Sequence, residues 1–209
     1  MVSAYVSIAF ALAFLALLGL LHFLKPELDP SWRMISEYEI GRFGWMMRLA
    51  FFCWGASVLA LLAAIWPSLQ STSGTIGRWW LLVIATALFA AGIFKTNAIT
   101  DRTPSRLSTL HTISGSIVIL TFPIAAAIAV SSLLNGGSWP TYQVPLVLGT
   151  ALVWIGVVAY FASIIIARVK DPTSGEPGGP VVYQGWPNRF MVVTYLAWII
   201  LVAGTSLRV

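Results

Sequence analysis

Residues 29–47 read DPSWRMISEYEIGRFGWMM, and this polar stretch separates two long apolar runs. Only 9% of the chain is Asp, Glu, Lys or Arg, whereas about 25% is usual in a soluble domain. The stretch nevertheless carries five charged side chains, at Asp29, Arg33, Glu37, Glu39 and Arg42. Charge this dense in so apolar a chain indicates a polar loop between two membrane helices and a candidate functional region.

The apolar residues make up 58% of the 209 residues, and they fall in blocks of about 20, the length that a helix needs to cross a bilayer. We therefore predict an all-α, polytopic membrane protein, with residues 1–209 forming a single domain of six transmembrane helices. The first block follows Met1 without the basic start and cleavage site of a signal peptide, so we expect it to be retained. The predicted spans are about 2–24, 44–66, 79–94, 107–134, 144–167 and 190–207.

The basic residues predict the orientation of these spans. With six spans, the first, third and fifth loops share one side, which receives ten of the twelve Lys and Arg residues and leaves only Arg78 and Arg208 opposite. The positive-inside rule then places these loops in the cytoplasm and both termini outside the cell membrane. Orientation and anionic lipid thus explain the net charge of +5, and no nucleic-acid partner is expected.

The acidic residues also all lie on the side of the first, third and fifth loops, although Asp and Glu contribute little to membrane orientation. The short loops on the opposite side explain part of this clustering, because they have little room for charge. A functional polar face on the odd-loop side is the other explanation. The acids concerned are Glu27, Asp29, Glu37, Glu39, Asp101, Asp171 and Glu176.

The first loop contains a helix-start pattern that explains only some of its charges. Ser36-Glu37-Tyr38-Glu39 fits a capping box, in which Ser36 and Glu39 satisfy each other's backbone donors and the second helix starts near Glu37. On a helix Glu37 and Glu39 would point about 200° apart, so both cannot face one site equally. Capping accounts for Glu39 but leaves Glu37 unexplained, together with the arginines near it, Arg33, Arg42 and Arg48.

The third loop, residues 95–111 with the sequence KTNAITDRTPSRLSTLH, is the second candidate cluster. Thr103 before Pro104 is typical of a helix start. Arg106 and His111 follow within two turns, and Asp101 lies just before. A lone histidine near a helix end is more often structural than a ligand, but here it lies at the membrane edge beside other polar groups.

No metal or cofactor is predicted. A metal site needs three or four convergent ligands, and the acids around His111 have no specific ligand spacing. Cys53 is the only cysteine, so no internal disulfide and no cysteine-rich cluster can form within this sequence. His22 and His111 on two spans could together ligate a haem, but no CxxCH or paired-histidine pattern supports that assignment.

Three short motifs together resemble those of a known family: Ile35-Ser36-Glu37 after the first span, Gly92 and Phe94 followed by Asp101 and Leu110-His111, and Gly185 four residues before Arg189. Over nearly its whole length the chain looks like the prokaryotic six-span membrane family known as domain of unknown function 998. The resemblance implies six spans and these functional positions, but no settled activity. More remotely, the chain is similar to the eukaryotic six-span family that includes GPI-lipid remodelling factors, which implies lipid handling at most.

The favoured function is binding or handling of an anionic membrane lipid or small anionic molecule. Arginine suits bidentate recognition of phosphate and carboxylate, and a charge at membrane depth should be paired with a ligand or a neighbour because leaving it unpaired costs about 2.5–3.5 kcal/mol. The candidate ligand-binding residues are Arg33, Ser36, Glu37, Arg42, Arg106, His111 and Arg189.

Two other functions are weighed against it. An enzyme acting on a lipid-linked substrate would use a general acid or base, for which Glu37, Asp101 and His111 are the candidates. A transporter would place charge deep inside the spans, and the span centres carry none, which counts against ion coupling.

Overall fold

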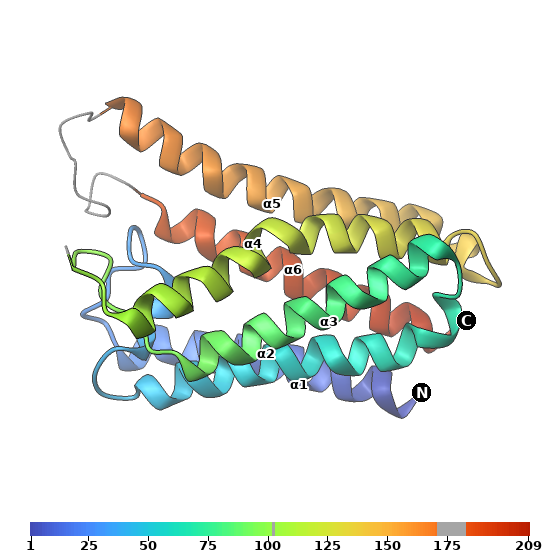
Figure 1. Cartoon of the computed structure of the whole chain (residues 1–209), viewed down its shortest axis with the longest axis horizontal. Helices are drawn as coiled ribbons and strands as arrows, with labels where there is room; N and C mark the ends of the chain where they lie inside the picture. Colours follow the sequence, from blue (N-terminus) through green and yellow to red (C-terminus); the bar gives the residue numbers. More distant parts are fainter. Residues whose placement is uncertain (102, 171–182) are drawn as a thin grey trace.

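A computed structural model describes residues 1–101, 103–170 and 183–209. These residues form six long helices, three single-turn 3-10 helices and no β-strand (Figure 1). The long helices are α1 (Val2–Leu24), α2 (Gly44–Ile65), α3 (Thr72–Ile93), α4 (Arg106–Leu133), α5 (Gln143–Lys170) and α6 (Gly185–Ser206). The short ones are η1 (Ile35–Glu39), η2 (Trp66–Ser68) and η3 (Trp139–Tyr142).

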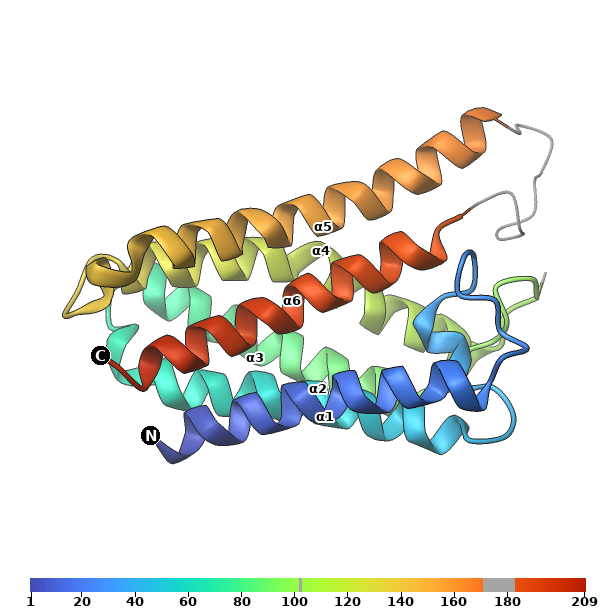
Figure 2. The same cartoon turned by 180° about the vertical axis from the view of Figure 1, so that it is seen from behind.

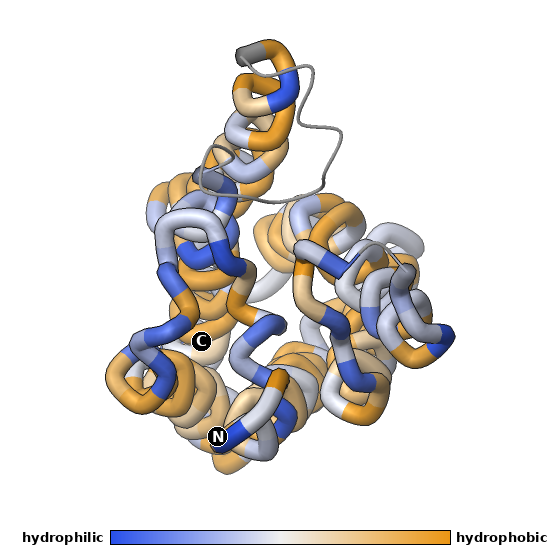
Figure 3. Tube along the Cα trace, turned by 90° about the vertical axis from the view of Figure 1, so that its left-hand side faces the viewer, coloured by the Kyte–Doolittle hydropathy of each residue, from blue (hydrophilic) through white to orange (hydrophobic). Residues whose placement is uncertain are grey.

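All six long helices are apolar enough to cross a membrane, which confirms the predicted all-α six-helix architecture of a multi-pass membrane protein. Both termini lie at one end of the bundle, and the loops after α1 and α3 lie at the other end (Figures 1 and 2). Viewed from that second end, hydrophilic loop segments cover the ends of the largely hydrophobic helices (Figure 3). Arg102, Asp171 and Glu176, which contribute to the predicted charge on this side, lie outside the described residues.

The helices are neighbours mainly in chain order: α1 packs on α2, α2 on α3, α3 on α4 and α5 on α6, while α1 also contacts α6. The exception is the pair α4 and α5. They run close together near η3 but diverge toward the end that carries the odd-numbered loops, as both side views show (Figures 1 and 2).

Two helices begin earlier than hydropathy predicts. Helix α3 starts at Thr72 rather than near residue 79, because the Ser71 hydroxyl accepts a hydrogen bond from the Gly74 N–H (3.0 Å) and caps a polar first turn. Helix α6 starts at Gly185 rather than near residue 190. In both cases hydropathy marks only the apolar part of the helix. A side-chain cap begins α3, whereas α6 has no side-chain cap and begins where the Gly185 N–H bonds to the Ser31 carbonyl.

The predicted capping box of the first loop is wrong. The segment forms the single turn η1, whose Glu37 carboxylate accepts from the Met34 N–H (2.9 Å), and the chain then turns at Phe43 with φ of 65° before α2 begins at Gly44. Glu39 instead accepts a hydrogen bond from the distant Thr96 N–H (3.1 Å). A tertiary contact therefore outweighed the local capping pattern.

The predicted start of the fourth helix is shifted by two residues. Ser105, not Thr103, is the N-cap of α4, and its hydroxyl accepts a hydrogen bond from the Ser108 N–H (3.2 Å). Ser105 also binds the side chain of Asn97 (2.8 Å). This second contact ties the start of α4 to the third loop.

The first loop docks directly on the start of α6. The Gly185 N–H donates to the Ser31 carbonyl (3.0 Å), and the Asn188 side-chain oxygen accepts from the Ile35 N–H (3.2 Å). A Cβ atom at Gly185 would collide with the Pro30 carbonyl oxygen and lie 2.8 Å from the Arg33 carbonyl oxygen. Glycine at this position therefore permits the close approach of the two backbones.

Candidate functional site

Arg189 fastens the first loop to the helix bundle. Its side chain is buried in α6, with only 5% of the residue exposed. Its five hydrogen bonds go to His22 Nε2 (2.8 Å), the carbonyl oxygens of Arg33 (2.6 Å), Gly185 (3.0 Å) and Pro30 (3.2 Å), and the Tyr38 hydroxyl (3.1 Å). The guanidinium thus joins α1, the first loop and α6 through neutral acceptors.

His22 is fully used by this arrangement. Its Nδ1 lies 2.7 Å from the Leu18 carbonyl oxygen, which can only accept, so Nδ1 carries the hydrogen and Nε2 accepts from Arg189. Neither ring nitrogen of His22 is left to ligate a haem iron.

Lys25 adds a second anchor at the end of α1. The residue is only 2% exposed, and its amine donates to the carbonyl oxygens of Tyr38 (3.1 Å) and Ile40. Burial lowers the pKa of the Lys25 amine, and the negative charge of Glu27 opposes this shift. The first loop is therefore held from two sides, by Lys25 and by Arg189.

Glu37 connects the first loop to the third. It is 1% exposed, and its Oε1 accepts from the Arg33 guanidinium (2.7 Å) and from the Ile99 N–H (3.0 Å). Its Oε2 accepts from the Met34 N–H. Both carboxylate oxygens are therefore occupied, and the buried charge is paired with a cation, as burial of a carboxylate requires.

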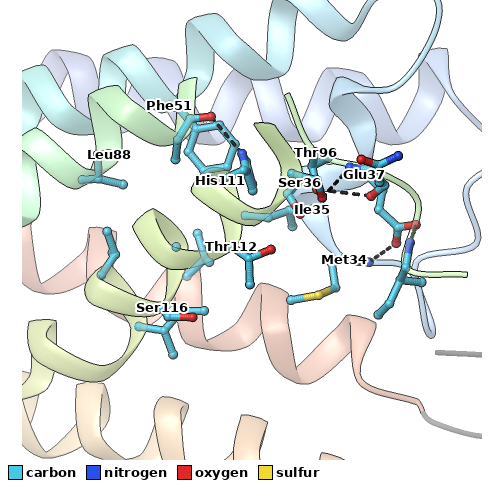
Figure 4. A pocket seen from close by; sticks show the side chains of 18 of the residues that line it. Met34, Ile35, Ser36, Glu37, Phe51, Leu88, Thr96, His111, Thr112 and Ser116 are labelled. Atoms are coloured by element: carbon cyan, nitrogen blue, oxygen red, sulfur yellow. Dashed lines mark hydrogen bonds between the residues drawn. The ribbon is translucent and has the colours of Figure 1, made fainter. Parts of the chain in front are cut away.

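A cavity of about 450 Å³ lies beside this junction, at the odd-loop end of the bundle (Figure 4). Its size is within the range of about 300–1,000 Å³ that is typical of small-molecule sites. Its polar lining comprises Ser36, Glu37, Thr96, Asn97, Asp101, Ser108, His111, Thr112, Ser116 and Tyr160. Its apolar lining includes Phe51, Trp54, Leu88, Val118, Ile119, Met191 and Val192. Most polar lining groups lie at the loop end, where Met34, Ile35, Ala98, Ile99 and Pro104 also line the cavity. The part within the bundle is mostly apolar, with Thr112 and Ser116 of α4 as its polar exceptions.

His111 is held so that one nitrogen is left over. Its Nδ1 lies 2.9 Å from the Phe94 carbonyl oxygen and 3.0 Å from the Ala91 carbonyl oxygen, at the end of α3. Because carbonyl oxygens only accept, Nδ1 carries the hydrogen, and in the neutral ring Nε2 is a hydrogen-bond acceptor. Nε2 has no partner within the described part of the chain, and His111 lines the cavity (Figure 4).

Glu39 lies next to His111, 7% exposed and incompletely satisfied. Its Oε2 is 3.8 Å from His111 Nδ1, and its Oε1 is 3.8 Å from Arg48 Nε. Both Oε1 and Arg48 Nε are buried without a hydrogen-bond partner in the described residues. Burial raises the pKa of the Glu39 carboxyl to about 7, against the opposing effects of the Thr96 N–H, Arg48 and Lys95.

Glu39 should make stability depend on pH. Its pKa is about 7 in the folded protein against an ordinary 4.5, so folding favours the protonated form. We expect its contribution to stability to be lost as the pH rises from about 4.5 to about 7. The melting temperature of Glu39→Gln minus that of wild type should therefore increase from about pH 5 to about pH 8. A difference that stays constant would contradict this, and Glu27→Gln, at an exposed position, is the matched control.

The structure brings together only part of the predicted site. Ser36, Glu37, Asp101 and His111 all line the cavity. Arg33 does not line it but forms an ion pair with the lining residue Glu37. Their roles in ligand binding or catalysis stay predictions.

The other predicted arginines lie apart from the cavity lining. Arg42 is exposed, with its guanidinium 4.6 Å from the Phe43 ring centre, and Arg106 is exposed on the first turn of α4. Arg189 is buried in the hydrogen-bond network that joins α1, the first loop and α6. The structure therefore does not bring the four arginines together on one anion.

The sequence interpretation missed the polar stripe on α4. Ser108, Thr112 and Ser116 recur every four residues and therefore share one face of the helix, and all three line the cavity together with Asn97. This spacing within a membrane helix was a signal that could have found them.

Comparison with known proteins supports the family assignment and goes no further. No curated protein and no solved structure matches the chain. The family described as "Protein of unknown function (DUF998)" matches residues 8–205, which is nearly the whole chain. The motifs in the first loop, the third loop and the entry to α6 therefore belong to one continuous match, and the chain is a member of this family.

Proposed function

We propose that the chain binds a lipid of the cell membrane in the cavity, with the headgroup at the odd-loop end and the apolar part along the inner lining. The observation that carries this proposal is one mostly apolar cavity whose polar lining groups lie mainly at the loop end. A membrane lipid is likewise mostly apolar, with its polar groups at one end. Gly115 and Ser116 of α4 and Tyr160 of α5 all line the cavity, so it is bordered by the two helices that diverge toward this end (Figure 2).

Two arginines near the loop end, both outside the cavity lining, favour a lipid that also carries a phosphate. Arg33 lies behind Glu37, and Arg106 is exposed on the first turn of α4, which starts beside the lining residue Pro104. Arginine is suited to phosphate oxygens. With the odd-numbered loops in the cytoplasm, as the positive-inside rule predicts, the headgroup end would face the leaflet that is richer in anionic lipid.

Filling the cavity tests this proposal. A Cβ atom at Gly115 would meet nothing within 4 Å, so Gly115→Trp has room to grow into the cavity that this residue lines. We expect the amount of copurifying lipid, measured by native mass spectrometry from native-lipid nanodiscs, to fall roughly tenfold. Ile113→Trp, at a 51% exposed position of the same helix, should leave it unchanged. Equal lipid content in both variants would reject the proposal.

A second candidate function is an enzyme acting on a lipid-linked substrate, favoured by one observation. His111 lines the cavity, its Nδ1–H is held by backbone carbonyls, and its Nε2 has no hydrogen-bond partner among the described residues, which is the arrangement that a general base needs. In the same mass spectra, a chemically altered lipid that accumulates with wild type would favour this second function over simple binding.

A further inference from the structure

The cavity offers neutral hydrogen-bonding groups rather than cations. Among the described residues, neither lysine nor arginine lines it. Of the two carboxylates in the lining, Glu37 has both oxygens occupied and its charge paired with Arg33, while Asp101 accepts from the Asn97 amide (2.8 Å) and is exposed. A headgroup inside the cavity would therefore meet chiefly neutral polar groups.

Four of these groups are available to a bound molecule. His111 Nε2 is an acceptor, as its bonded Nδ1 dictates. The hydroxyl groups of Ser36, Thr112 and Ser116 also line the cavity, and each can both donate and accept. None of the four has a hydrogen-bond partner in the ranges that the structure covers.

We infer that the ligand headgroup carries a hydroxyl that donates its hydrogen to His111 Nε2, so that His111 selects a polyol headgroup, such as glycerol, over one without an O–H donor. This inference rests on the proposed lipid binding and adds the class of lipid. The physical reason is that a headgroup lacking the donor would remove water from a buried acceptor without replacing its hydrogen bond. A polyol has further hydroxyls for Ser36, Thr112 and Ser116, whereas an ammonium headgroup would find the buried carboxylate of Glu37 already paired.

The test compares two lipids that differ only in these hydroxyls. Phosphatidylglycerol and phosphatidylpropanol have the same charge, the same acyl chains and the same number of headgroup carbons. We expect the wild-type protein, titrated with each lipid in native mass spectrometry, to bind phosphatidylglycerol about tenfold more tightly. In His111→Phe this ratio should fall severalfold, because the ring remains and the acceptor is lost, while Ser36, Thr112 and Ser116 can still bond to the remaining hydroxyls.

The ratio of the two lipid affinities distinguishes a loss of headgroup selectivity from a general disturbance of the fold. A variant that only disturbed the fold would weaken the binding of both lipids and keep the ratio, which would overturn the role of His111. Thr121→Val is the matched control, because Thr121 lies on the same helix, bonds to the Ile117 carbonyl (2.6 Å) and does not line the cavity; it should keep the wild-type ratio. If His111→Phe does not fold, the ratio measured with the wild-type protein still tests the preference for a polyol headgroup.

Each outcome of the wild-type titration has a separate meaning. Equal affinity for the two lipids would overturn the inference while leaving lipid binding in place. Binding of neither lipid, with no lipid retained on purification, would overturn both proposals.

Discussion

Arg189→Ala is expected to lower the melting temperature by about 8–16 °C, the largest effect of any single substitution proposed for this chain. The substitution removes the donor for five hydrogen bonds that join α1, the first loop and α6. Loss of a buried, charged donor with several partners costs on the order of 4 kcal/mol. The loss can be followed by the fluorescence of the ten tryptophans during thermal unfolding in nanodiscs.

Two variants make the Arg189 result specific. Arg208→Ala removes the same side chain from an exposed position near the C-terminus and should leave the melting temperature unchanged. Arg189→Lys keeps the charge but loses the planar fork, so it should recover only part of the lost stability. In Arg189→Ala, hydrogen exchange should increase over residues 29–38, because these residues lose their anchor. A melting temperature within about 2 °C of wild type would show that the Arg189 hydrogen bonds contribute little to stability.

Glu37→Gln is expected to have the second-largest effect, a fall in melting temperature of about 6–12 °C. The carboxylate pairs with Arg33 and accepts two backbone N–H groups, at Met34 and Ile99. A neutral amide keeps at most part of this set and leaves Arg33 near a buried site without its counter-charge, which costs on the order of 3 kcal/mol. Because Glu37 joins the first loop to the third, both loops should exchange hydrogen faster.

Glu27→Gln is the matched control for Glu37, since it makes the same chemical change at an exposed position of the same loop. We expect no measurable shift in its melting temperature. Equal shifts in the two variants would mean that net charge, rather than the buried junction, determines the effect. Unchanged stability in Glu37→Gln would mean that the carboxylate is not structural, and its role would then lie with the ligand alone.

Residue type and position near a span end predicted some residues of the candidate site but not others. Ser36, Glu37, Asp101 and His111 stand out by residue type near span ends, and all four line one cavity. The arginines look equally suitable in the sequence, yet Arg42 is exposed and Arg189 is buried against neutral acceptors. The two arginines differ in environment because a guanidinium bonds to whichever acceptors the folded chain places near it. The acceptor His22 lies 167 positions from Arg189 in the sequence.

Local capping patterns also failed where residues far apart in the sequence come into contact. Ser36 and Glu39 fit a capping box, but Glu39 instead binds the Thr96 N–H, 57 residues further along. Ser71 and Ser105 cap α3 and α4, although hydropathy and the Thr103-Pro104 pattern predicted other starts. Both hydroxyls also bond to side chains outside their own helices, Ser132 (2.8 Å) and Asn97 (2.8 Å) respectively.

The amino-acid sequence by itself determined the six apolar helices, their alternating direction and the end of the bundle that carries the acids, because hydropathy and helix length act through local chain properties. Only the tertiary structure decided that α4 and α5 diverge, that a cavity opens beside His111, and which charged groups are paired. These features depend on contacts between residues far apart in the chain, and no local pattern encodes the distance between them.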